Sequence, residues 1–495
     1  MVTTGRRSPV VAALDHPAAL WVIVVVAAIV RFATLAQQSF WDDEGYTVGL
    51  MRSPNVHALL HGVARTESAP PTYYVFAWLW THIFGISEFG LRSLSAVAGT
   101  ATVYVCYEIA SRVATRAAGA VAAAAAALNP LLIWYSQEAR AYALFALFAS
   151  IALLFFTRAI ISGSRRDVWY WAIASSLTLA THYFAAFLVA PEAFVLLWRG
   201  RRTLREFVGP IVLVLATAAC LAPLALEQRN KRFAFANSPL SRRIAQVPEQ
   251  FLVGYGVWAT PWGKLAAAAA FACAVVGGLL ALRSGQRTAQ VGTSLFVVAA
   301  IAILLPIAYA EVGSDYVLTL YFIAVLPVLV VAVSLGWARS TMGVALAAAY
   351  LIIGGTVEAA VVATPEFQRE DIRGVSSRLE HPCVKRAIVI SPSTVLEAYM
   401  TNLATMHQSG ARVREIDLVA MAVKLTGQHE TVPRKLRVSP PAAGFHLVST
   451  DFADRFSLFR FRAATPEHVT PTALAQSRVG PWPANRASVD IENCS

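Results

Sequence analysis

Long apolar runs recur along the chain to about residue 363, and they constrain its fold more than any other feature. The 495 residues are 57% hydrophobic and only 14% charged, whereas an ordinary soluble domain has about 25% charged residues. A helix that crosses a bilayer needs about 20 apolar residues. The sequence therefore predicts a polytopic α-helical membrane protein with a soluble C-terminal tail of ordinary composition.

Arginine clusters between the apolar runs orient the predicted helices, because Lys and Arg concentrate in cytoplasmic loops. The clusters assigned to the cytoplasm are Arg6/Arg7, Arg112/Arg116, Arg165/Arg166, Arg199/Arg201/Arg202/Arg205, Arg283/Arg287 and Arg339. They imply about eleven spans of the required length, near 19–36, 92–111, 117–133, 141–160, 168–182, 184–198, 207–225, 264–282, 290–310, 317–337 and 341–363. The N-terminus is then cytoplasmic and the C-terminal tail extracytoplasmic, and the first run is expected to be a signal anchor.

Two domains are expected, a transmembrane catalytic domain over residues 1–363 and an extracytoplasmic domain over residues 364–495. Within the first outer loop, 37–91, the aromatic stretch Thr72–Ile86 is too short to span and predicts a juxtamembrane helix on the outer face. The tail is expected to be a small α/β or α+β domain. Its predicted elements are a strand at Val384–Ser391, a helix at Thr394–Gly410 and one or two strands within Val448–Phe461. The sequence does not decide whether the segment from Thr465 onward is disordered or packs over the surface of the domain.

The net charge of +12 would suggest a nucleic-acid partner in a soluble protein. Here much of the excess lies in short loops between apolar runs, where it serves as a topology signal. We therefore expect no nucleic acid among the partners. Three of the five cysteines lie in apolar runs and are expected to pack there. Cys383 and Cys494 lie in the tail, and whether they pair is open.

Three consecutive carboxylates, Asp42, Asp43 and Glu44, stand between Trp41 and Tyr46 just beyond the first apolar run. Acidic groups at a membrane surface must stay hydrated, paired or metal-bound. The plainer interpretation is a hydrated loop that caps a following helix. The number of carboxylates and their interfacial position favour a functional one, in which a carboxylate takes a proton from an acceptor hydroxyl or the cluster holds a cation.

Further candidates lie near the predicted outer ends of other spans. Glu67 precedes the pair Pro70-Pro71, which can serve only to start a helix, and Glu67 could support the acidic site. Arg92 either extends to the lipid headgroups or pairs with a carboxylate or phosphate. In the segment WYSQEARAY, residues 134–142, a local ion pair is worth about 0–1 kcal/mol. The aromatic residues beside the charges favour binding, and the candidates there are Glu138, Arg140 and Tyr142.

His182 and Tyr183 end a predicted span at the outer face, where a lone histidine is more often structural than a ligand. The predicted outer loop Glu227–Gly263 contains a basic run with Arg229, Lys231 and Arg232. The topology rule does not account for basic residues on that side, so an anionic partner at the outer surface is expected. No zinc spacing, P-loop or GxGxxG fingerprint occurs in a credible strand–helix context. A donor delivered through the membrane is therefore favoured over a soluble nucleotide.

Four short segments recur in an order and spacing typical of a known family. They are Asp43-Glu44, Ala69-Pro70-Pro71-Thr72-Tyr73-Tyr74, Leu91-Arg92-Ser93-Leu94-Ser95, and Ser136–Tyr142 with Thr181-His182-Tyr183-Phe184. Over residues 20–363 the chain thereby resembles the GT-C glycosyltransferases of the protein O-mannosyltransferase and aminoarabinose-transferase type (glycosyltransferase family 39). The resemblance implies inverting transfer of a sugar from a polyprenyl-phosphate carrier on the extracytoplasmic side.

The same resemblance implies roles for individual residues. Asp43 would be the general base, and Glu44 would support it or the acceptor. Arg92 and Arg140 would hold the first loop or the lipid phosphate. Asp42, Glu67, Glu138, Tyr142, His182 and Tyr183 are expected to bind substrate. No cofactor is required, and a divalent metal on Asp43 and Glu44 is left open.

The sequence departs from the family pattern at Ala69, where His or Lys is frequent, and at Leu320, where a basic residue often precedes the tyrosine. Either Arg229, Lys231 or Arg232 rebuilds the phosphate site, or this member has lost activity. Two alternatives to an enzyme therefore stay open, a transporter or flippase of lipid-linked saccharides and an inactive scaffold. A transporter should place charges at the bilayer midplane, whereas the polar groups here gather at one predicted face.

The remaining expectations concern location and partners. The Ala-, Val- and Arg-rich composition suggests a high-GC bacterial source. The protein is then expected in the bacterial plasma membrane, among membrane lipids, with a cell-envelope glycan, lipid or protein as the acceptor.

Overall fold

The structure is a computed structural model that describes residues 9–199, 204–229, 238–313, 315–379, 385–391, 395–421, 424–425, 428–429, 438–476 and 488–492. Contacts between Cα atoms divide the chain into two units. The helical unit comprises Met1–Leu35 and Ser53–Ala360, and the sheet unit comprises Ala36–Arg52 and Val361–Ser495. The predicted domains, residues 1–363 and 364–495, stay a prediction.

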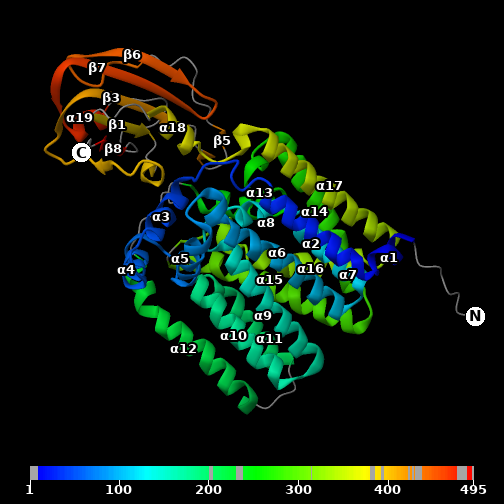
Figure 1. The fold of residues 1–495 in the computed structure, drawn as a ribbon. Coiled ribbons are helices and arrows are strands. Elements are labelled where there is room, and N and C mark those ends of the chain that lie inside the picture. Colours follow the sequence, from blue (N-terminus) through cyan, green and yellow to red (C-terminus); the bar gives the residue numbers. More distant parts are fainter. Residues whose placement is uncertain are drawn as a thin grey trace, which may run out of the picture. The chain divides into compact units, whose positions relative to one another are not determined.

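The helical unit contains nearly all of the helices (Figure 1). Their bounds are α1 Pro9–Leu14, α2 Pro17–Phe32, α4 Val56–Thr66, α5 Thr72–Phe84, α6 Glu88–Val113, α7 Arg116–Ala127, α8 Pro130–Ser136, α9 Tyr142–Ser162, α10 Arg165–Thr181, α11 Ala185–Arg199, α12 Leu204–Gln228, α13 Leu240–Val257, α14 Pro261–Leu282, α15 Gln286–Val312, the 3-10 turn η2 Thr319–Phe322, α16 Val325–Trp337 and α17 Thr341–Ala363. A helix lies at every predicted span, and α5 lies where the juxtamembrane helix was predicted.

Five helices in the described part of the chain, α9, α12, α14, α15 and α17, are long and apolar enough to cross a membrane. The most apolar window of α12 is only 17% buried. Its large exposed side chains include Val208, Val212 and Leu215, and an apolar surface of this extent is stable in lipid but not in water. The chain is therefore a multi-pass membrane protein, while the predicted number of spans stays a prediction.

The predicted span 117–133 is not one straight helix, since α7 and α8 meet at a bend of 61°. Pro130 opens α8, where its missing N–H costs nothing. The carbonyl groups that end α7 accept instead from the buried Arg31, whose Nη1 lies 3.0 Å from the Ala127 oxygen and Nη2 3.1 Å from the Ala126 oxygen. This arginine thereby satisfies the backbone at a break inside apolar surroundings.

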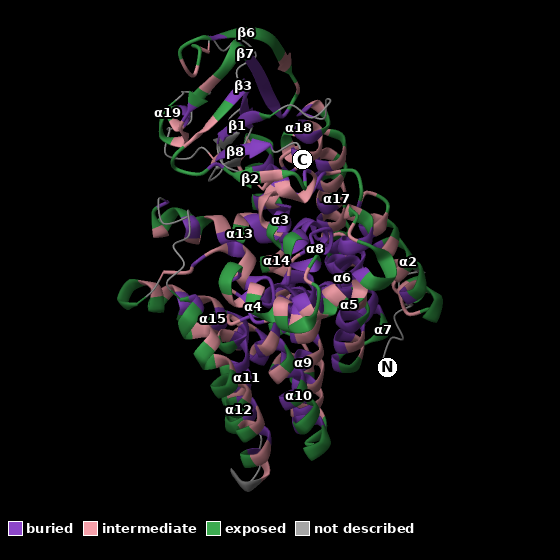
Figure 2. Ribbon diagram, turned by 60° about the vertical axis from the view of Figure 1, so that its left-hand side comes forward, coloured by how far each residue is buried: buried purple, intermediate pink, exposed green. Residues whose placement is uncertain are grey.

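The interior of the helical unit is formed by α6, α7, α8 and α16. The buried residues around α6 and α8 are purple in Figure 2. Eight of the twelve residues of α7 are buried alanines. Small side chains let helix backbones approach closely, which is how helices pack inside a membrane without a hydrophobic driving force.

The sheet unit contains a six-stranded sheet with the order β2-β8-β1-β3-β7-β6. The strands are β1 Arg386–Ser391, β2 Leu403–Thr405, β3 Ala411–Met421, β6 Phe445–Phe452, β7 Phe456–Val469 and β8 Ser488–Glu492, beside a short pair, β4 Lys424–Leu425 and β5 Gln428–His429. The helical elements are α3 Asp42–Met51, α18 Ile372–Leu379, α19 Pro471–Ala475 and the 3-10 turns η3 Pro365–Phe367 and η4 Leu396–Ala398. Only β1 and β3 pair in parallel among the sheet neighbours.

The strand predictions at 384–391 and 448–461 are confirmed by β1, β6 and β7. The predicted helix at Thr394–Gly410 is wrong. Its described residues form η4, β2 and turns, because the backbone of Leu403–Thr405 pairs with β8 as an antiparallel strand. The segment after Thr465, whose course was open, supplies the end of β7, α19 and the inner strand β8.

Candidate functional site

The acidic triplet forms the first turn of α3, in the sheet unit. Negative side chains there interact favourably with the helix dipole. Glu44 is fully buried, and its Oε2 accepts from the Trp41 backbone N–H at 3.3 Å. Glu44 thus caps the helix, as the plainer interpretation of the triplet expects. A functional role for Asp42 and Asp43 stays a prediction.

The two aspartates of this turn are half-buried. Asp42 Oδ1 accepts from the backbone N–H of Val395 at 3.1 Å, so Asp42 ties α3 to the segment before η4. Asp43, the next residue of the first turn, is likewise half-buried. The triplet therefore contains three different environments, and a carboxylate that is partly accessible to solvent is the one suited to meet an acceptor hydroxyl.

In the helical unit, three predicted segments meet at one carboxylate. Glu67, at the end of α4, is 2% exposed. Arg140 binds it through two nitrogens, Nη1 at 3.0 Å from Oε1 and Nη2 at 2.8 Å from Oε2. Tyr74, on α5, donates its hydroxyl to Oε2 at 2.6 Å. Burial raises the pKa of Tyr74 well above its usual value, so this hydroxyl stays a neutral donor.

An aromatic cluster lies next to this ion pair in the sequence. His182 stacks on Phe145 with ring centroids 4.8 Å apart. It also contacts Tyr142 at 5.9 Å and Tyr321 at 5.2 Å between ring centroids. Tyr321 directly follows Leu320, the position where the family often has a basic residue. The structure thus brings two predicted residues, Tyr142 and His182, into one aromatic cluster.

Tyr183 is hydrogen-bonded to Gln228. Its hydroxyl donates to Gln228 Oε1 at 2.9 Å, and Gln228 Nε2 donates to the carbonyl of Val63 at 3.2 Å. Arg229 is exposed, and its carbonyl accepts from the Tyr316 hydroxyl at 3.1 Å. Gln228 carried no signal in the sequence that would link it to Tyr183. Lys231, Arg232, Cys383 and Cys494 lie outside the described residues.

Arg92 and Glu138 are both about 1% exposed. Arg92 Nη1 donates to the Leu35 carbonyl at 2.8 Å. The interpretation of Arg92 as an arginine that only reaches for the headgroups is therefore wrong, because its whole side chain lies inside the protein. A buried charge must be paired and hydrogen-bonded to persist. Arg92 and Glu138 therefore belong to a polar part of the protein interior.

The ion pair between Arg243 and Asp315 was not predicted from the sequence. Arg243, 4% exposed on α13, binds both carboxylate oxygens of Asp315, with Nη1 2.8 Å from Oδ1. This arginine also donates to the Val317 carbonyl at 2.8 Å. The hydrogen bond from Arg243 lowers the pKa of Asp315. A separation of 72 residues along the chain offers no local pattern from which this pair could be predicted.

No group of three or more His, Cys, Asp and Glu side chains in the described ranges is arranged to hold a metal ion. Asp43 and Glu44 are adjacent in the sequence, but Glu44 is fully buried and its carboxylate accepts from the Trp41 backbone N–H. A divalent metal on these two residues therefore stays a hypothesis.

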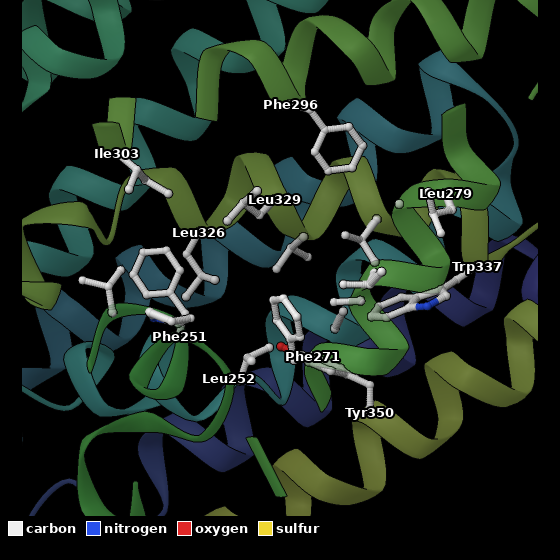
Figure 3. Close-up of a pocket in the computed structure, with 18 of the residues that line it drawn as sticks. Phe251, Leu252, Phe271, Leu279, Phe296, Ile303, Leu326, Leu329, Trp337 and Tyr350 are labelled. Atoms are coloured by element: carbon white, nitrogen blue, oxygen red, sulfur yellow. The ribbon is translucent and has the colours of Figure 1, made fainter. Parts of the chain in front are cut away.

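A cavity of about 600 Å³ lies within the helical unit (Figure 3). Its wall consists of side chains of α13, α14, α15 and α16, with Tyr350 of α17 and Ala125 of α7. Two polar atoms among its lining side chains are already hydrogen-bonded: Tyr350 accepts from Asn129 at 2.9 Å, and Trp337 Nε1 donates to the Cys273 carbonyl at 2.9 Å. The lining is otherwise hydrocarbon. An occupant of this cavity must itself be apolar.

Comparisons with known proteins agree with this architecture. Residues 68–226 match the model of the family described as dolichyl-phosphate-mannose-protein mannosyltransferase. The structure of ArnT from Cupriavidus metallidurans bound to undecaprenyl phosphate aligns with a TM-score of 0.54 at 14% identity, covering 89% of this chain and 97% of that protein. The chain has the GT-C fold. The predicted fold class, a polytopic GT-C protein with a small C-terminal sheet domain, is therefore confirmed.

Other GT-C proteins resemble the chain more weakly. The arabinosyltransferase EmbB from Mycobacterium smegmatis gives a TM-score of 0.42 at 17% identity, covering 67% of this chain and 31% of EmbB. The oligosaccharyltransferase of Archaeoglobus fulgidus gives 0.46 at 13% identity, covering 74% of this chain and 57% of that protein. No curated protein matches the sequence.

Proposed function

We propose that the protein is an inverting glycosyltransferase that moves a sugar from a polyprenyl phosphate to a cell-envelope acceptor on the extracytoplasmic face of the bacterial plasma membrane. The observation that carries this proposal is the apolar cavity inside a GT-C fold. A volume of about 600 Å³ with a hydrocarbon lining suits a stretch of polyprenyl chain. The structure of ArnT, which has the same fold, holds undecaprenyl phosphate.

Asp43 is the proposed general base. It takes the proton of an acceptor hydroxyl as the hydroxyl oxygen attacks the anomeric carbon of the sugar. The bond from that carbon to the phosphate oxygen breaks, and the polyprenyl phosphate leaves with the electron pair. Attack opposite the leaving group inverts the anomeric centre. A polyprenyl phosphate is a good leaving group, so the reaction needs no strong general acid.

Cationic side chains stabilise the negative charge that grows on the departing phosphate. Arg92, Arg140 and the basic run with Arg229, Lys231 and Arg232 are the proposed sources. Asp42, Glu44, Glu67, Glu138, Tyr142, His182 and Tyr183 are proposed to shape the donor and acceptor sites. No cofactor is required in this proposal, and full activity in excess chelator would agree with it. Loss of activity that Mg²⁺ restores would assign a metal to Asp43 and Glu44.

The test uses purified full-length protein with undecaprenyl phosphate carrying radiolabelled mannose or arabinose, and a cell-envelope extract as acceptor. Asp43→Asn keeps the size of the side chain but removes its basicity, and it should lower transfer by about 10²–10⁴-fold. Asp451→Asn, which removes an exposed carboxylate from β6, is the matched control and should retain activity. Transfer at the normal rate by Asp43→Asn would reject the assignment. Movement of the labelled lipid across vesicles without transfer would identify a flippase instead.

A further inference from the structure

The acidic helix α3 is attached at several points to residues 395–399 of the same unit. At its start, the Phe40 backbone N–H donates to the Tyr399 hydroxyl at 2.6 Å. In its first turn, Asp42 accepts from the Val395 N–H. At its end, Arg52 donates to two successive carbonyls, of Glu397 at 2.8 Å and of Ala398 at 3.1 Å.

The donors and acceptors in these contacts are chemically matched. The carbonyls of Glu397 and Ala398 belong to η4, and the last carbonyls of a helical turn lack partners within it. A planar guanidinium with several donors can bind two such oxygens at once. The segment before α3 is tied down as well, since the Ser39 hydroxyl donates to the Glu370 carbonyl at 2.7 Å and accepts from the Ile372 N–H at 3.0 Å.

The closest approach lies at Gly45, in the middle of this attachment. A Cβ atom placed on Gly45 would lie 2.6 Å from Val395 Cβ and 2.8 Å from its Cγ1. Ordinary side-chain carbons do not approach so closely, so any side chain at Gly45 would move α3 away from Val395. Gly49, one turn further along, has open space within 4 Å of its Cβ position.

We propose that residues 395–399 are the seat that positions the catalytic carboxylate, with Val395, Tyr399 and Arg52 as positioning residues. This inference rests on the proposed function for its catalytic consequence. The seat holds α3 at its start, its middle and its end, so the first turn with Asp43 has a fixed place in the sheet unit. Proton transfer needs the base within hydrogen-bond reach of the acceptor, and a displacement of about 1 Å can cost about 10²-fold in rate.

A pair of glycine variants tests the seat. Alanine is a better helix former than glycine, so Gly45→Ala and Gly49→Ala change helix propensity equally and differ only in the contact with Val395. Gly45→Ala should lower kcat for transfer from undecaprenyl phosphate-linked mannose or arabinose by about tenfold or more, with KM for the donor unchanged. Gly49→Ala should stay within about twofold of the wild type, because its new methyl group meets nothing.

Removal of the opposing side chain provides the rescue. Val395→Gly deletes the two side-chain atoms that would clash with the new methyl group, and it leaves the Val395 carbonyl oxygen, 3.4 Å away, and the N–H that binds Asp42. The double variant with Gly45→Ala should therefore recover most of the lost rate. Equal activity of Gly45→Ala and Gly49→Ala would overturn the proposal, and so would a failed rescue alongside an active Val395→Gly single variant.

A readout without substrate separates this proposal from the proposed function. Hydrogen exchange of the α3 amides, followed by mass spectrometry of the full-length protein, should accelerate in Gly45→Ala but not in Gly49→Ala or the double variant. Unchanged exchange in Gly45→Ala would reject the seat itself. Altered exchange in Gly45→Ala, with full transfer activity in Asp43→Asn, would instead keep the seat and reject the catalytic role.

Discussion

Arg140 binds Glu67 through two nitrogens, with Nη1 3.0 Å from Oε1 and Nη2 2.8 Å from Oε2, and Glu67 is only 2% exposed. The two residues come from segments 73 positions apart in the chain. This bidentate geometry is specific to arginine among the basic side chains. The pair joins the double-proline segment to the loop after α8. It therefore stabilises the packing of these two segments as well as the two charges.

Arg140→Ala should destabilise the protein by about 3–5 kcal/mol, because it leaves the Glu67 carboxylate buried without its counter-charge. Chemical unfolding of the detergent-purified protein measures this loss. The double variant with Glu67→Gln removes the stranded charge and should recover part of the stability. Equal stability of Arg140→Ala and the wild type would show that the pair contributes nothing to the folded state.

Ala274→Trp should fill part of the apolar cavity, since Ala274 on α14 lines it. We expect about tenfold weaker binding of undecaprenyl phosphate, a loss of about 1.4 kcal/mol, and a much smaller effect on farnesyl phosphate, whose chain is short. Leu265→Trp, on the exposed face of the same helix, is the control. If both lipids lose affinity equally, the cavity does not hold the distal chain.

The Arg243–Asp315 pair predicts a stability loss in acid. The hydrogen bond from Arg243 lowers the pKa of Asp315 in the folded state. The stabilisation is therefore complete above the unfolded pKa of about 3.9 and disappears as the pH falls below it. Asp315→Asn should lower the thermal midpoint at pH 7 and flatten its dependence on pH below about 4. A slope identical to that of the wild type would exclude a contribution from this carboxylate.

Asp490 on β8 predicts the opposite dependence on pH. Burial, assisted by the nearby Glu397, raises the pKa of Asp490 to about 6. The ionised form therefore costs stability, a cost that is absent at pH 4 and complete above about pH 7. Asp490→Asn should stabilise the protein by about 2–3 kcal/mol at pH 8 and by almost nothing at pH 4. Thermal unfolding at both values tests this, and an equal gain at both would point to packing instead of charge.

Periodicity and length were enough to predict most of the helices, because an apolar run of spanning length has few alternatives. The break between α7 and α8 was not predicted, since it depends on Arg31, whose partners Ala126 and Ala127 lie far along the chain. The false helix at Thr394–Gly410 has a related cause. Its local composition permits a helix, while pairing of Leu403–Thr405 with the distant strand β8 makes the end of this segment a strand.

The candidate site was predicted in part. Glu67, Arg140, Tyr142 and His182 were singled out by type and position, and the structure connects each of them to another predicted or aromatic residue. The partners Gln228, Tyr399 and Arg243 were not predicted, because the local sequence around a polar residue does not indicate its contacts with distant parts of the chain. The cavity could not be foreseen either, since a lining leucine and a lipid-facing leucine look alike in a sequence.

The contacts of α3 with residues 395–399 also determine when this helix can reach its final place during synthesis. The helix emerges from the ribosome early, but Val395 and Tyr399 follow some 350 residues later. A nascent chain that already contains α17 still lacks the residues to which Asp42 and Phe40 are bound. The helix therefore reaches its final place only after the helical unit has been made.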